Sequence, residues 1–236
     1  MSLVLFDLDG TLVDSGPGIR ASVRHAAASV GIAEPTDEQL RALIGPPFPE
    51  AFLDVLGVDP ATADAMMADY RDTYGAGGMF DASVYAGVPE LLAELTDRGD
   101  VLAVATSKPG EYAREIVAYL GLAEHVAGGV HGTTFDGRVQ GKAAVVGLAL
   151  AANAPVLAHG PALSHGPGLS HGPGLALVGD RHHDVEGARV HGLPCVGVDW
   201  GFGGRDELEA AGAAVVVDKP GEVPAALDAL RSAAPR

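Results

Sequence analysis

The chain has 236 residues, with 15 Lys and Arg against 31 Asp and Glu, and its formal net charge at pH 7 is −16. Such an acidic excess repels phosphate backbones and anionic lipid surfaces, so we expect no nucleic-acid partner and no membrane partner. The apolar fraction of 47% supplies a core and excludes a disordered chain, and the length suits one large domain or a core with an inserted subdomain.

Further features predict a cytoplasmic location. No apolar run approaches the roughly 18 residues that span a bilayer. The opening residues, MSLVLFDLDG, have no basic segment before their apolar run, so we expect no signal peptide. Cys195 is the single cysteine, so no internal disulfide can form, which fits a reducing compartment.

In chain order, short apolar runs alternate with longer amphipathic stretches. The runs are bounded by Gly, Asp or Pro, as strands buried on both faces are. We expect strands at Leu3–Phe6, Val101–Ala105, Val126–Val130, Leu175–Val178, Cys195–Val198 and Ala213–Val217. Apolar residues at helical spacing predict helices at Pro89–Arg98, Glu111–Leu120, Ala143–Ala152 and Val185–Val190. The alternation predicts an α/β fold, a Rossmann-like parallel sheet flanked by helices.

Residues 16–85 interrupt this alternation. Four helical stretches follow one another there without a convincing strand, separated by Gly and Pro. They are Gly18–Val30, Asp37–Ile44, Pro49–Leu56 and Ala61–Tyr74. We therefore predict an all-helical subdomain at 16–85, inserted into a core made of residues 1–15 and 86–236.

Residues 158–175 are three tandem hexapeptides, AHGPAL, SHGPGL and SHGPGL. Pro and Gly in every copy prevent a helix, and three copies are too few to bury a core of their own. The regular spacing of His159, His165 and His171 allows metal binding as an alternative. We interpret the segment as a low-complexity surface loop within the core.

Reactive residues follow three of the predicted strands. They are Asp7 and Asp9 after the first run, Thr106, Ser107 and Lys108 after the second, and Asp180 and Asp184 after the run at 175–178. Because the carboxyl ends of parallel strands share one edge of the sheet, where ligands bind, we expect these side chains to converge.

The acidic residues among them predict a metal site. Asp7 and Asp9 are two apart and face the same side of an extended segment, where their repulsion favours a hard cation or keeps one of them protonated. Asp180 adds a third carboxylate, and an oxygen-only shell predicts Mg²⁺. The alternative, a solvated turn, is disfavoured because an unpaired charge directly after a buried strand is costly.

Four segments together resemble the four motifs of the haloacid dehalogenase (HAD) superfamily of phosphohydrolases, in order and spacing. They are DLDGTLVDS at 7–15, VATSKP at 104–109, GKAAVV at 141–146 and VGDRHHDVEGA at 178–188. The helical insertion resembles the C1 cap of the phosphoglycolate phosphatase-like subfamily. LIGPPF at 43–48, VYAGVPELLAEL at 84–95 and GVDWGFGGRDELEAAGA at 197–213 resemble its phosphoglycolate phosphatase and 5′-nucleotidase-like branch.

The resemblance implies Mg²⁺-dependent hydrolysis of a small-molecule phosphomonoester through an aspartyl-phosphate. Asp7 would be the nucleophile and Asp9 the general acid and base. Thr106 and Lys142 would complete the catalytic set by binding phosphoryl oxygens. The metal set would be Asp7, Asp9 through its backbone carbonyl, Asp180 and Asp184. The remaining substrate-binding residues would be Gly10, Thr11, Ser107 and Lys108, with Arg41 and Gly45 from the cap.

The substrate stays open between two classes. A carboxylate-bearing substrate such as phosphoglycolate would need a cap arginine, with Arg20, Arg24 and Arg41 as candidates. A nucleoside monophosphate would need an apolar or aromatic face, from Phe48 or Phe52. Two alternative functions are a phosphomutase of the same fold and a non-enzymatic phospho-receiver module. We expect a monomer or a homodimer.

Overall fold

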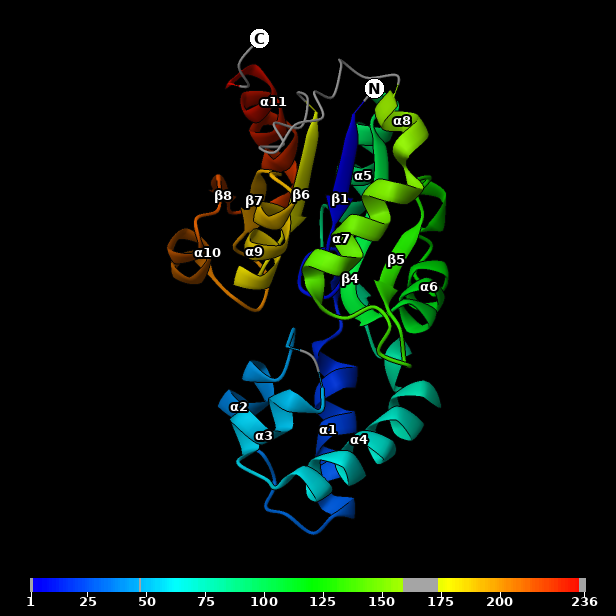
Figure 1. Cartoon of the computed structure of the whole chain (residues 1–236), viewed down its shortest axis with the longest axis vertical. Helices are drawn as coiled ribbons and strands as arrows, with labels where there is room; N and C mark the ends of the chain where they lie inside the picture. The colour runs from blue at the N-terminus through cyan, green and yellow to red at the C-terminus, as the bar shows by residue number, and fades with distance from the viewer. Residues whose placement is uncertain (1, 47, 159–173, 234–236) are drawn as a thin grey trace. The chain divides into compact units, whose positions relative to one another are not determined.

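The computed structural model describes residues 2–46, 48–158 and 174–233, which form two compact units (Figure 1). We call residues 1–12 with 84–236 the sheet unit and residues 13–83 the helical unit. The insertion expected at 16–85 and the helical unit differ by a few residues at each end. Pro47 and most of the predicted repeat loop, with His159, His165 and His171, lie outside the described residues.

A six-stranded parallel sheet forms the centre of the sheet unit, in the order β5-β4-β1-β6-β7-β8. Its strands are β1 (Leu3–Phe6), β4 (Val101–Pro109), β5 (Val130–Thr133), β6 (Leu175–Gly179), β7 (Cys195–Val198) and β8 (Val215–Val217). β1 lies between β4 and β6, with Phe6 opposite Val104 and Val178. All four residues of β1 are fully buried, as the continuous apolar run predicts. The predicted α/β fold with a parallel sheet is confirmed.

Helices cover both faces of this sheet. They are α5 (Val88–Asp97), α6 (Gly110–Tyr119), α7 (Gly141–Ala152), α8 (Ala154–Ala158), α9 (His182–Val190), α10 (Arg205–Ala211) and α11 (Val223–Ala233), with 3₁₀ turns η2 (Ala123–His125) and η3 (Pro220–Glu222). Residues alternate between faces along a strand, so Leu3 and Leu5 share one face. There they join Val145 of α7 and Val185 of α9 in one apolar core. α7 and α9 face the viewer in Figure 1, and α5 lies behind the sheet.

Several element boundaries differ from the prediction. The strand expected at Val126–Val130 is wrong, since β5 begins at Val130 and the buried Val126 instead closes the 3₁₀ turn η2. An apolar run of this length marks burial, and periodicity alone does not separate a packed turn from a strand. β4 continues to Pro109, and α9 begins three residues before its predicted start at Val185.

The helical unit contains α1 (Gly16–Ser29), α2 (Asp37–Ala42), α3 (Glu50–Leu56), α4 (Pro60–Gly75) and the 3₁₀ turn η1 (Gly78–Phe80). The short strand β2 (Val13–Asp14) pairs with β3 (Ser83–Val84), which the sequence did not predict. Thr36 and Gln39 form a capping box that starts α2. Among the described residues, no helix has the length and apolar character to cross a bilayer.

Candidate active site

Three strand ends meet at the carboxyl edge of the sheet. Asp7 directly follows β1, and its N–H donates to the carbonyl of Val178 in β6, at 2.9 Å. Thr106, 1% exposed, lies in the last part of the adjacent β4. Asp180 directly follows β6 and is fully buried. The order β4-β1-β6 therefore brings three segments that are far apart in sequence to one place.

Lys142, at the start of α7, links these segments. Its Nζ lies 2.7 Å from Oδ1 of Asp7 and 2.7 Å from Oδ1 of Asp184, and it donates to the carbonyl of Ala105 at 3.0 Å. Burial opposes its charge, but the carboxylates of Asp184 and Asp7 outweigh burial and raise the pKa of Lys142 above its ordinary value. Lys142 is thus a fixed ammonium beside two carboxylates.

Three buried carboxylates form the acidic cluster, which we define as Asp7, Asp180 and Asp184. One oxygen from each lies within 4.8 Å of the others. Asp180 accepts hydrogen bonds from the N–H of Phe202 at 2.8 Å and from Thr11 Oγ1 at 3.3 Å. Burial raises the pKa of Asp7 to about 6, with Lys142 opposing and Asp184 adding to the shift. Burial, then Asp184 and Asp7, raise the pKa of Asp180 well above its usual value.

The acidic cluster fits a hard divalent cation. Three carboxylates and one ammonium leave two negative charges uncompensated when all are ionised. Asp7 Oδ1 and Asp184 Oδ1 are buried and contact Lys142 as ion pairs, without accepting a hydrogen bond of good geometry. Buried oxygen ligands with excess negative charge are what Mg²⁺-type ions bind in proteins. The cluster could therefore hold a divalent metal.

Comparison with known proteins places this chain in a family. A sequence model described as haloacid dehalogenase-like hydrolase matches residues 4–138, more than half of the chain, and a second HAD-hydrolase-like model matches residues 165–223. The chain belongs to the haloacid dehalogenase-like hydrolase family. The predicted membership is confirmed, and the chain is an enzyme of the hydrolase class.

Named relatives of this HAD hydrolase cover most of its length. A 5′-nucleotidase of Pseudomonas aeruginosa is 39% identical over 207 residues, 88% of this chain and 86% of the relative. Tyrosine-protein kinase PtkA of Mycobacterium tuberculosis is 37% identical over 231 residues, 98% of this chain and 72% of the relative. The crystal structure of a predicted phosphatase from Clostridium acetobutylicum is 33% identical, with a TM-score of 0.84 over 97% of this chain and 98% of that one.

The remaining predicted residues of the HAD hydrolase fall into two groups. Asp9, Gly10, Thr11, Ser107 and Lys108 lie with the acidic cluster in the sheet unit. Nζ of Lys108 is 2.8 Å from Oδ2 of Asp9, so its nearest charge is a carboxylate of the protein. Arg41 and Gly45 belong to the helical unit, where Arg41 is an exposed residue in the last turn of α2.

Two candidate substrate contacts of the helical unit already have structural roles. Phe52 is fully buried and stacks on Phe48 with ring centroids 4.4 Å apart, so Phe52 is a core residue and presents no open face. Arg24 pairs with Glu34 at 3.0 Å and with Asp37 at 2.9 Å, which occupies its guanidinium. The burial of Phe52 and the pairing of Arg24 across a loop could not be predicted from local sequence, because both depend on tertiary packing.

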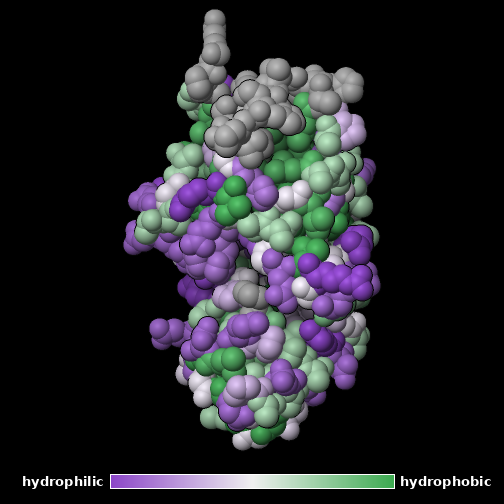
Figure 2. Space-filling view, viewed as in Figure 1, coloured by the Kyte–Doolittle hydropathy of each residue, from purple (hydrophilic) through white to green (hydrophobic). Residues whose placement is uncertain are grey.

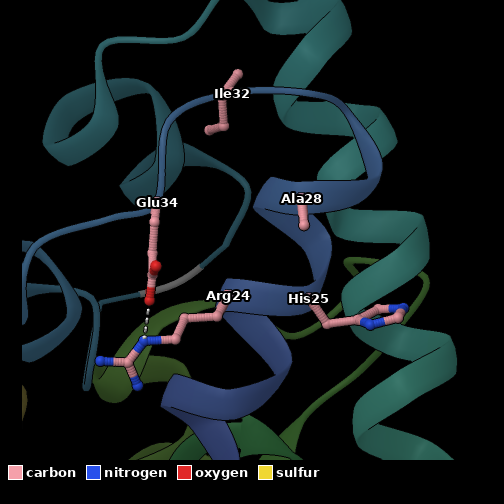
Figure 3. Close-up of a pocket in the computed structure, with 5 residues that line it drawn as sticks. All are labelled: Arg24, His25, Ala28, Ile32 and Glu34. Atoms are coloured by element: carbon pink, nitrogen blue, oxygen red, sulfur yellow. Dashed lines mark hydrogen bonds and ion pairs between the residues drawn. The ribbon is translucent and has the colours of Figure 1, made fainter.

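The helical unit has a hollow of about 360 Å³ around Arg24 (Figure 3). Ala28 and His25 line it from α1, and Ile32 and Glu34 line it from the following loop. Within the hollow, the guanidinium of Arg24 donates a hydrogen bond to Glu34, as Figure 3 shows. The residues predicted to be catalytic, Asp7, Asp9, Thr106 and Lys142, all lie in the sheet unit, so this hollow carries no predicted chemistry.

Two supports of the site were not predicted as functional residues. The segment 200–203, WGFG, packs on the acidic cluster, where Phe202 donates to Asp180 and a Cβ on Gly201 would overlap the Asp180 side chain. Glu207 of α10 accepts from Arg181 Nε at 2.8 Å and from the N–H of His182 at 2.9 Å. The only signal in the sequence was the glycine spacing of WGFGG, which indicates close approach of the backbone.

Proposed function

We propose that this HAD-family phosphatase hydrolyses a small-molecule phosphomonoester with Mg²⁺ bound, through an aspartyl-phosphate on Asp7. The observation that carries the proposal is the position of Asp7, a buried carboxylate that contacts the ammonium of Lys142 and lies beside the carboxylates of Asp180 and Asp184. A carboxylate that is fixed in this way can act as a nucleophile, and the charges around it suit an anionic phosphoryl group together with a cation.

The proposed reaction has two displacements at phosphorus. An oxygen of Asp7 attacks in line, a bond from Asp7 to phosphorus forms, and the bond to the leaving oxygen breaks while Asp9 supplies the proton. Water then attacks phosphorus, Asp9 takes the proton of that water, and the bond from Asp7 to phosphorus breaks. Lys108 has to release Asp9 before Asp9 can carry this proton, since Nζ contacts both carboxylate oxygens, at 2.8 and 3.0 Å.

Asp7, Asp180 and Asp184 would hold the metal, with the backbone carbonyl of Asp9. When bound, Mg²⁺ offsets the repulsion between the anionic nucleophile and the anionic substrate. Lys142 and the hydroxyl of Thr106 would bind phosphoryl oxygens, with Ser107, Gly10 and Thr11 in support. These roles rest on the placement of the side chains at one sheet edge and on the match to the family.

The substrate class that we propose is a phosphoglycolate-like molecule or a nucleoside monophosphate. Relatives carry both names, a 5′-nucleotidase at 39% identity and a phosphoglycolate phosphatase of Pseudomonas syringae at 30% identity over 96% of this chain. With Arg24 paired and Phe52 buried, Arg20, Arg41 and Phe48 remain as candidate selecting residues of the helical unit. We propose this unit as the cap, and a cytoplasmic monomer or homodimer as the working form.

Purified protein with Mg²⁺ should release phosphate from a generic aryl phosphate, and Asp7→Asn should lower the rate at least about 1,000-fold, as loss of a covalent nucleophile does. A screen of phosphorylated metabolites, with phosphoglycolate and nucleoside monophosphates included, then identifies the substrate. Silence of the wild type across the whole panel would refute hydrolysis. Isomerised product without phosphate release would indicate a phosphomutase, and transfer from ATP to a tyrosine peptide would indicate a kinase.

A further inference from the structure

The N-terminal part of α9 carries a second group of side chains that could ligate a metal, beside the acidic cluster. We call His182, His183 and Glu186 the α9 triad. One donor atom from each lies within 4.8 Å of the other two. Both imidazoles are half-buried, with ring centroids 3.8 Å apart, and Glu186 is exposed. An ion in solvent can therefore reach all three donors.

The donor set of the α9 triad differs in kind from that of the acidic cluster. Two imidazole nitrogens and one carboxylate suit Zn²⁺ and related first-row ions, whereas Mg²⁺ prefers oxygen ligands alone. A fourth position would be left for water, as in zinc sites with three protein ligands. We propose that His182, His183 and Glu186 bind a transition-metal dication of the Zn²⁺ type at a site separate from the acidic cluster.

The neighbouring helix α10 supports this assignment. Nδ1 of His182 lies 2.7 Å from Oε1 of Glu207. In the tautomer that donates from Nδ1 to Glu207, the lone pair of Nε2 is available to a metal, and the ring is held in place. Glu207 is itself held, because Arg181 and the N–H of His182 donate to the same oxygen. A carboxylate behind a ligating imidazole is the usual outer shell of a zinc-bound histidine.

The surroundings of the α9 triad also favour a cation. The ion pair of Arg181 with Glu207 offsets both of those charges, and the exposed Glu186 adds a negative charge at the triad itself. Most of the visible surface over α9 and α10 is hydrophilic (Figure 2). Asp184 lies on the same helical turn and ion-pairs with Lys142. A metal on the triad would thus stiffen the turn that carries a residue of the acidic cluster.

The test is Zn²⁺ binding by equilibrium dialysis, with millimolar Mg²⁺ present throughout to occupy oxygen-ligand sites. The wild type should bind one Zn²⁺ more than the double variant His182→Ala/His183→Ala. Glu186→Gln should weaken that site at least about tenfold, and Glu207→Ala should weaken it about 10–100-fold. The matched control is His25→Ala, because His25 is an exposed histidine 3.5 Å from Asp69 on the helical unit. The control should bind as the wild type does.

Long-range ¹H–¹⁵N NMR of the imidazole rings gives a direct second readout. Zn²⁺ should shift one nitrogen in each of two rings, and both signals should be absent from the double variant. The wild type and all the variants keep the histidines of the tandem repeats, so any Zn²⁺ bound by those histidines contributes equally to each measurement. Equal stoichiometry and affinity in wild type and double variant would overturn the proposal. If the double variant fails to fold, unchanged binding by Glu186→Gln, which alters an exposed side chain, would overturn it equally.

Discussion

At the scale of single residues, Lys142 is the cation that contacts two carboxylates of the acidic cluster. Its Nζ lies 2.7 Å from two buried carboxylates, and its own side chain is only 4% exposed. Gly187 of α9 makes this position possible, because a Cβ there would overlap the stem of Lys142. Removing one member of a buried ion network leaves the others uncompensated, and this costs more than the network gains by forming.

Lys142→Met should therefore lower the free energy of unfolding by about 3–5 kcal/mol while keeping the apolar stem. Mg²⁺ should recover part of that loss, because a cation in the acidic cluster replaces the missing charge. Urea unfolding with and without Mg²⁺ measures both effects. The control is Lys219→Met, whose side chain is 73% exposed and 3.7 Å from Glu222, and it should change little. Equal losses in the two variants would contradict the role of Lys142.

Glu207 gives a residue-scale prediction with a pH signature. Burial alone would raise the pKa of Glu207, but the N–H of His182 and the Arg181 guanidinium outweigh burial and lower it to about 2. A depressed folded-state pKa contributes stability above the unfolded value of about 4.3, and this stability is lost as the pH falls toward the folded value.

Glu207→Gln should therefore lower the free energy of unfolding by roughly 1 kcal/mol at neutral pH, a figure discounted because the side chain is 28% exposed. The difference from wild type should shrink between about pH 4 and about pH 2. Denaturant titrations across this range measure it. Glu209→Gln, at an exposed position beside Arg205, serves as the control and should leave the free energy of unfolding at neutral pH close to that of the wild type. If the difference in free energy of unfolding between the wild type and Glu207→Gln stayed constant down to pH 2, the charge of Glu207 would not be its cause.

At the scale of elements, the turn after β1 positions the acidic cluster. Gly10 has φ +83°, and a Cβ there would overlap the Asp180 carboxylate and the Phe202 ring. The turn is held further by the indole of Trp200, which donates to the carbonyl of Thr11 at 3.1 Å. The turn and the segment 200–203 thus enclose Asp180 from two sides.

Gly10→Ala should therefore displace Asp180 and weaken Mg²⁺ binding at least about tenfold, besides destabilising the fold. The matched control is Gly99→Ala, because Gly99 has φ +80° but no atom within 4 Å of the added Cβ. That variant should lose only about 1–2 kcal/mol of stability, from the backbone strain of a non-glycine residue at positive φ, and should keep its metal affinity. Calorimetric Mg²⁺ titration of both variants separates the two effects. If the Gly10→Ala and Gly99→Ala variants bound Mg²⁺ equally well, the overlap of the added Cβ with Asp180 would have no effect on the metal site.

At the scale of the whole molecule, the net charge of −16 destabilises the compact state through self-repulsion. Salt screens this repulsion over a Debye length of about 10 Å at 0.1 M. The melting temperature of the metal-free protein should therefore rise by a few degrees when NaCl increases from about 0.01 M to about 0.2 M. The rise should be smaller near pH 4.7, where the charges of the sequence sum to about zero. Thermal unfolding followed by circular dichroism measures it, and a fall in melting temperature with salt would contradict the prediction.

Much of the fold followed from local pattern. β1, β6 and β7 are continuous apolar runs with a polar residue directly after them, and the prediction placed their starts correctly. The error at Val126 arose because burial of a 3₁₀ turn produces the same apolar run as a strand. The predicted end of β4 and the predicted start of α9 were both wrong, because the reactive and polar residues at these places belong to the strand and to the helix and do not lie outside them.

The sequence by itself determined the parallel α/β fold, the family and the side chains that meet at one sheet edge, because strand ends and motif spacing are local properties. Only the tertiary structure decided which charges pair. Lys142 joins Asp184 as well as Asp7, Lys108 joins Asp9, and Glu207 lies behind His182, because packing places α7 and α10 against the sheet and strand pairing places β4 beside β1. Pairing depends on distance across elements, and no local pattern encodes that distance.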